Sequence, residues 1–164
     1  MPDSQKISEK QSEYMNLIAE IMDIRKRGEK PVAYIRTYGC QQNVADSEKI
    51  KGMLEQSGFE FADEPDNADF ILFNTCAVRE HAEDRVFGNV GALKNLKRKH
   101  PQILIALCGC MMEQEHVANK IYKSFPFVGL VFGTHSLHHF PELMYNALPV
   151  SYTHLRAHET GRNL

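Results

Sequence analysis

Short apolar or β-branched runs alternate with helix-like segments along most of the chain, and this alternation is the strongest constraint on its fold. The runs expected to form strands are "PVAYIRTY" at 31–38, "FEFAD" at 59–63, "DFILFNT" at 69–75, "QILIALCG" at 102–109 and "FVGLVFG" at 127–133. Strands that alternate with helices form parallel sheets with right-handed crossovers. The pattern therefore predicts an α/β fold, an open, doubly wound, mostly parallel sheet of about five strands, of the Rossmann or flavodoxin type.

The intervening segments have apolar residues at helical spacing. Helices are expected at 8–27, 43–57, 78–99, 113–125 and 136–148. Asn43 is expected to be the N-cap of the second helix, and Pro141 is expected in the first turn of the last one. Three parts of the chain follow from this reading: an N-terminal amphipathic helical extension at 1–30, one domain at 31–148, and a tail at 149–164 that is expected to be non-native or disordered.

Composition limits the classes of protein to consider. The net charge of −2 over 164 residues argues against a broad nucleic-acid-binding surface, although basic clusters occur at 25–30 and 94–100. No secretory signal opens the chain, and no run approaches the roughly 20 apolar residues of a membrane span. A cytoplasmic protein without membrane contact is therefore expected. Its four cysteines would be reduced there, which leaves metal binding, catalysis or simple burial as their roles.

Three of the cysteines occupy equivalent positions. Cys40, Cys76 and Cys110 each come directly after a predicted strand, whereas Cys108 still belongs to one. All strands of a parallel sheet end at the same edge, which is where open α/β sheets bind ligands. Each thiol also precedes a helix, whose N-terminus favours the thiolate form. The sequence predicts that these three thiols face one crevice.

Several ligands fit this pattern. Three thiolates from separate loops suit a [4Fe–4S] cluster bound through three irons. Zinc with His81 or His116 as a fourth ligand is an alternative, although both histidines are expected on helix surfaces, and His154 with His158 forms a further i, i+4 pair. A cysteine nucleophile is a weaker interpretation because no histidine is paired with one at fixed spacing. A nucleotide site is weaker still, because no phosphate-binding glycine loop follows the first strand.

The motifs around the cysteines resemble a known family. "TYGCQQNVADSE", "FNTCAVREHAEDRVFGNVGALKNLK" and "LCGCMMEQE", followed by "FVGLVFGTHSLHHFPEL", resemble the N-terminal domain of the radical-SAM methylthiotransferases. The likeness covers residues 31–148 and is strongest to members that add a methylthio group to C2 of N6-isopentenyladenosine 37 in tRNA. The tRNA would be bound through the full-length protein. Sister enzymes that modify threonylcarbamoyladenosine or a ribosomal protein remain alternatives, as does a stand-alone Fe–S or metal-binding module.

The resemblance implies specific roles for the residues of these motifs. It makes Cys40, Cys76 and Cys110 the ligands of an auxiliary [4Fe–4S] cluster, whose open iron binds the sulfur species to be transferred. The neighbouring polar residues and the fourth cysteine are either capping and turn residues or hydrogen-bond partners of the cluster; they are Asn43, Asn74, Thr75, Arg79 and Cys108.

The chain also departs from the family. The second [4Fe–4S] cluster of these enzymes binds S-adenosylmethionine and is held by a C-x3-C-x2-C motif, which is missing here. The RNA-binding domain of the family is missing too. The resemblance therefore implies a fragment that holds the auxiliary cluster and is inactive by itself.

Overall fold

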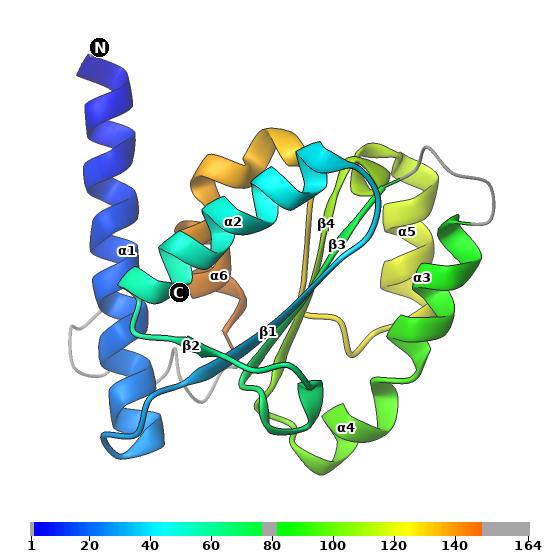
Figure 1. The fold of residues 1–164 in the computed structure, drawn as a ribbon, viewed down its shortest axis with the longest axis horizontal. Helices are drawn as coiled ribbons and strands as arrows, with labels where there is room; N and C mark the ends of the chain where they lie inside the picture. The colour runs from blue at the N-terminus through cyan, green and yellow to red at the C-terminus, as the bar shows by residue number, and fades with distance from the viewer. Residues whose placement is uncertain (1, 77–81, 149–164) are drawn as a thin grey trace.

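The computed structural model describes residues 2–76 and 82–148 and contains one five-stranded sheet (Figure 1). Its strand order is β2-β1-β3-β4-β5 and every pairing is parallel, which confirms the α/β fold predicted from the sequence. This 2-1-3-4-5 order is that of flavodoxin-like sheets. The strands are β1 (Val32–Thr37), β2 (Glu60–Phe61), β3 (Phe70–Thr75), β4 (Leu104–Gly109) and β5 (Leu130–Phe132).

Helices cover the sheet on two faces (Figure 1). One layer holds α1 (Pro2–Lys26), α2 (Gln41–Gln56) and α6 (Phe140–Ala147). The other layer holds α3 (Ala82–Gly91), α4 (Lys94–Lys99) and α5 (Glu115–Ser124). Three short 3-10 segments complete the described elements: η1 (Pro65–Asn67), η2 (Cys110–Glu113) and η3 (Thr134–His139).

The central strands β3 and β4 are buried along their whole length. Leu104 and Ala106 belong to the core beneath α1, α2 and α6, whereas Ile105 and Leu107 belong to the core beneath α3 and α5. A parallel strand covered on both faces needs apolar side chains at every position, which explains why these runs do not alternate with polar residues.

The N-terminal helix is present and belongs to the core. Ile18, Ile21 and Met22 are at most 2% exposed and pack in the same cluster as α2 and α6. The helix starts at Pro2, earlier than the apolar spacing suggested. None of the helices within 2–76 and 82–148 is long and apolar enough to cross a membrane.

Two helix boundaries differ from the sequence prediction. The helix expected at 78–99 is divided: α3 ends at Gly91 and α4 begins at Lys94. The Leu93 amide donates to Val90 O, a tighter turn that buries the Leu93 side chain. The segment expected as the last helix begins with η3, and α6 starts only at Phe140, with Pro141 in its first turn as predicted.

Candidate functional site

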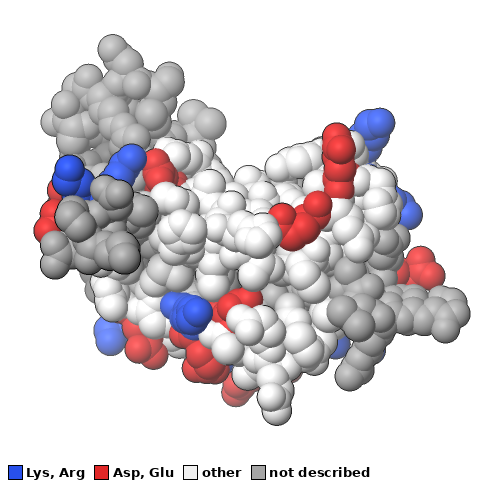
Figure 2. Space-filling model, turned by 90° about the horizontal axis from the view of Figure 1, so that it is seen from above, with Lys and Arg blue, Asp and Glu red and all other residues white. Residues whose placement is uncertain are grey.

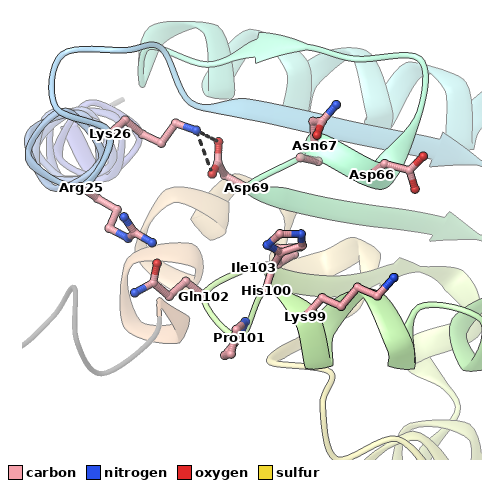
Figure 3. Close-up of a pocket in the computed structure, with 11 residues that line it drawn as sticks. Arg25, Lys26, Asp66, Asn67, Asp69, Lys99, His100, Pro101, Gln102 and Ile103 are labelled. Atoms are coloured by element: carbon pink, nitrogen blue, oxygen red, sulfur yellow. Dashed lines mark hydrogen bonds and ion pairs between the residues drawn. The ribbon is translucent and has the colours of Figure 1, made fainter.

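Three cysteines follow three adjacent strands of the sheet. Cys40 comes after β1, Cys76 after β3 and Cys110 after β4. From β1 the chain adds β2 on one side, and it then adds β3, β4 and β5 on the other side. The switch point of this fold therefore lies between β1 and β3, and Cys40 and Cys76 flank it. Figure 2 looks onto this edge, and much of the surface at its centre carries no charge. The edge is the candidate site.

Cys40 is the N-cap of α2, with extended backbone angles (φ −94°, ψ −178°). Asn43, which the sequence suggested as the cap, lies three residues further on and forms the other half of a capping box. Its Oδ1 accepts from the Cys40 amide at 3.3 Å and from the Cys40 thiol at 3.2 Å. The pKa of the Cys40 thiol is lowered, first by the backbone N–H of Asn43 and then by that of Gln42. Hydrogen bonds from these amides favour the thiolate at the helix N-terminus.

Gly39 lets the β1 loop approach Cys76 closely. Its φ is +106°, and a Cβ added to it would overlap Cys76 Cβ and lie 3.2 Å from Cys76 Sγ. The Cys76 side chain also hydrogen-bonds with the Cys40 thiol, which further lowers the Cys40 pKa. The exposed Cys40 and the buried Cys76 are therefore neighbours across the switch point.

Gly109 has the same role beside Cys110. Its φ of +110° with ψ of 178° is a conformation that is almost confined to glycine. An added Cβ would overlap the backbone of Thr75 and lie 2.8 Å from Asn74 Oδ1. The half-buried Cys110 points its thiol toward Thr75 O at 3.9 Å. This contact places Cys110 next to the residue that precedes Cys76.

A buried pair of amide side chains joins the loops. Asn43 Nδ2 donates to Asn74 Oδ1 and to Thr75 O, each at 3.0 Å. In return, Asn74 Nδ2 donates to Asn43 O at 2.8 Å and to Ser47 Oγ at 3.0 Å. Asn43 and Asn74 are at most 4% exposed, so every one of these bonds is shielded from water. The pair fixes the Cys40 turn against the end of β3.

Cys108 differs from the other three cysteines. It lies within β4, is 2% exposed, and belongs to the core beneath α1, α2 and α6. Burial raises the pKa of its thiol strongly, and the nearby Asp46 raises it further. The Cys108 carbonyl accepts from Thr75 Oγ1 at 2.9 Å, which ties β4 to β3. This thiol is protonated and inaccessible at neutral pH.

Other residues proposed from the sequence fall elsewhere. His116 is exposed on α5, whereas Arg79, His81, His154 and His158 lie outside the described residues, as does the tail at 149–164. Over 2–76 and 82–148, no three His, Cys, Asp or Glu side chains surround a point where one metal ion would bind.

Sequence reasoning missed two polar residues that support the site. Ser47, 2% exposed, bonds Thr37 Oγ1 at 2.7 Å as well as Asn74. Asp46, 5% exposed, accepts from Gln42 Nε2 at 2.9 Å. Ser47 is four residues after Asn43 and therefore on the same side of α2. This spacing is the sequence signal that could have identified Ser47 as part of the site.

The comparison with protein families identifies the domain. The model of the uncharacterized protein family UPF0004 matches residues 32–133, which include all four cysteines. This chain belongs to that family. The matched region of the UPF0004 domain begins at the start of β1 and ends just after β5, so it contains the complete sheet.

Curated relatives of this UPF0004 chain share a name. The protein from Caldicellulosiruptor saccharolyticus is 53% identical over 128 residues, the one from Clostridium perfringens 50% over 127, and the one from Halalkalibacterium halodurans 49% over 133. These alignments cover 78%, 77% and 81% of this chain but 27%, 28% and 24% of the relatives. Each relative is named tRNA-2-methylthio-N(6)-dimethylallyladenosine synthase. The chain thus spans about a quarter of the length of these relatives.

Proposed function

We propose that this chain is the auxiliary-cluster domain of a radical-SAM tRNA methylthiotransferase, with a [4Fe–4S] cluster bound by Cys40, Cys76 and Cys110. The observation that carries the proposal is the position of these thiols, one after each of three adjacent strands, at the switch point of the sheet. The name shared by the relatives supports tRNA as the substrate of the whole enzyme.

The spacing of the strands favours a cluster over a single metal ion. Neighbouring strands lie about 4.8 Å apart, so loops that follow three adjacent strands start across a width of about 10 Å. A [4Fe–4S] cube needs its thiolates at roughly 6–7 Å from one another, because each binds a different iron. A single zinc ion would need sulfurs at about 3.8 Å. We therefore propose a cluster in place of a single ion.

The residues of the site have separate roles in binding the cluster. Cys40 supplies an exposed thiol whose pKa is lowered by the amides of Asn43 and Gln42. The Asn43–Asn74 pair holds the Cys40 turn, and Gly109 brings Cys110 against Thr75. When bound, the cluster would supply an iron with an open position for the sulfur that is transferred to the substrate. Cys108 takes no part in binding it.

The remaining chemistry belongs to other parts of the full-length enzyme. We propose that the enzyme adds a methylthio group to C2 of N6-isopentenyladenosine 37 and acts in the cytoplasm, where tRNA is modified. It would use a second [4Fe–4S] cluster and S-adenosylmethionine. This chain has four cysteines and no C-x3-C-x2-C motif, so it lacks ligands for that second cluster. Radical chemistry requires that cofactor, and protein side chains cannot replace it. The domain at 31–148 is therefore inactive without it.

The test uses a full-length enzyme that contains this sequence. The Cys40→Ala variant should lose methylthiolated adenosine in isopentenylated tRNA while it still cleaves S-adenosylmethionine to 5′-deoxyadenosine. The matched Cys108→Ala variant should retain both products. The 164-residue chain with its cluster assembled should form neither. Methylthio transfer by the Cys40→Ala enzyme would contradict the proposal, and so would 5′-deoxyadenosine formation by the chain alone.

A further inference from the structure

Two side chains of β1, together with Tyr38 just after it, form a strip on the sheet face that carries α3 and α5. Tyr34, Arg36 and Tyr38 alternate with Ile35 and Thr37, which face the opposite layer. Tyr34 and Tyr38 are half-buried, and Arg36 is exposed. The Arg36 guanidinium lies 4.9 Å from the centre of the Tyr38 ring, a cation–π contact. The strip, defined as Tyr34, Arg36 and Tyr38, leads along β1 directly to Cys40.

Among the residues that the structure describes, no helix covers this part of the sheet as one would in a fully doubly wound fold. The β2-to-β3 connection contains only the 3-10 turn η1, whereas α3 and α4 join β3 to β4 and α5 joins β4 to β5. The buried core on this face is made mostly of residues from β3, β4 and those helices, and the two tyrosines border it. Figure 1 shows α3 and α5 together on one side of the sheet.

The strip is held in place, and Arg36 is its one charged side chain. Tyr38 OH accepts from Asn89 Nδ2 of α3 at 2.7 Å, and the Tyr38 ring meets Phe73 edge-on at 5.8 Å. Burial raises the pKa of Tyr38, and its charged neighbours Arg36 and Arg85 oppose that shift. Glu60 of β2 pairs with Val32, at the far end of β1 from Cys40. Fixed aromatic rings beside arginines are typical of surfaces that bind single-stranded RNA, where bases stack on rings and phosphates contact cations.

We propose that the strip binds the single-stranded loop of an RNA substrate and directs it to the cysteine-bearing edge of the sheet. The rings of Tyr34 and Tyr38 stack on unpaired bases, and Arg36 contacts a backbone phosphate. This proposal rests on the proposed function, which makes tRNA the substrate, and it adds a binding surface on this domain. A folded protein domain is the competing occupant. The exposed Arg36 beside the Tyr38 ring and the direct path to Cys40 favour RNA.

The test is the binding of a fluorescent, adenosine-rich RNA heptamer to the 164-residue chain without cluster, followed by anisotropy at low salt. Tyr34→Leu and Tyr38→Leu should each weaken binding by about 5- to 100-fold, the loss expected for one stacked base. Tyr38→Phe should bind as the parent does, because it keeps the ring and loses only the bond to Asn89. Arg36→Gln should weaken binding and reduce the dependence of log K on log salt by about 0.7, the value for one phosphate contact.

Matched substitutions elsewhere on the surface act as controls. Tyr122→Leu on α5, where the side chain is 58% exposed, and Arg98→Gln on α4 should leave the affinity for the heptamer unchanged. A heptamer that binds equally well to the Tyr34→Leu and Tyr38→Leu chains, or that fails to bind the parent chain, would overturn the proposal and leave the strip as a protein-docking face. Cluster assembly is measured separately on the same variants. Failure of the RNA proposal is therefore distinct from failure of the cluster proposal.

Discussion

Gly39 and Gly109 determine how closely the three cysteine loops approach one another. Each has a positive φ, and each has atoms of a neighbouring segment where a Cβ would lie. Gly52, in the middle of α2, has no atom within 4 Å of its added Cβ and no positive φ. The two types of glycine should therefore respond in opposite ways to the same substitution.

Gly109→Ala should lower the free energy of unfolding by about 2–4 kcal/mol, because it combines a glycine-only conformation with overlap against the backbone of Thr75. Gly52→Ala should raise the same quantity by about 0.5–1 kcal/mol, because alanine is the better helix former. Urea denaturation followed by circular dichroism measures both. If Gly109→Ala is as stable as the parent chain, the close approach of β4 to β3 at this turn is wrong.

The four thiols should differ in reactivity because their surroundings differ. Cys40 is exposed and has a lowered pKa, so a larger fraction is thiolate at pH 7.5 than for an ordinary cysteine. Burial raises the pKa of Cys108 and excludes reagent from it. Iodoacetamide should therefore alkylate Cys40 before Cys108 in the folded chain, as read by peptide mass spectrometry. In urea the preference should disappear; equal labelling of the folded chain would contradict this account.

Among the helices, α2 has one feature that the sequence pattern predicted and one that it did not. Its apolar face, with Ile50 and Leu54 buried, follows from spacing alone. Its N-cap, Cys40, does not follow from the sequence, because asparagine is a preferred N-cap residue and cysteine is not. Asn43 is buried against Asn74, a partner 31 residues away, and that contact decides which residue caps the helix. Local propensity contains no information about such a partner. The division of α3 from α4 likewise depends on burial of Leu93.

The N-terminal helix α1 offers a matched pair of isoleucines. Ile18 is fully buried in the core cluster that α1 shares with α2 and α6, whereas Ile24 is 46% exposed on the same helix. Ile18→Ala should lower the free energy of unfolding by about 2–4 kcal/mol, and Ile24→Ala should change it by less than about 1 kcal/mol. Chemical denaturation of both variants measures the difference. Equal, small effects would mean that α1 is not part of the core of this domain.

For the molecule as a whole, the sequence predicted the architecture because each buried strand is followed by a helix of recognisable period. The same reasoning placed Cys40, Cys76 and Cys110 at one edge, since parallel strands end together. The strand order could not be predicted in this way, because the pairing of β1 with β3 is a contact between segments far apart in the sequence. The sequence also did not predict the open face of β1. That face results from the β2-to-β3 connection, which contains the 3-10 turn η1 in place of a covering helix.

The most direct test of the account is the iron content and Mössbauer spectrum of the Cys108→Ala chain after anaerobic reconstitution, in which only the three edge thiols remain. The account predicts about four irons and four sulfides per chain, with the spectrum of a [4Fe–4S] cluster. Removing Cys110 from the parent chain instead should abolish most of this iron. A Cys108→Ala chain that loses its iron while the Cys110→Ala chain keeps it would contradict the account, as would a single bound metal ion in place of a cluster.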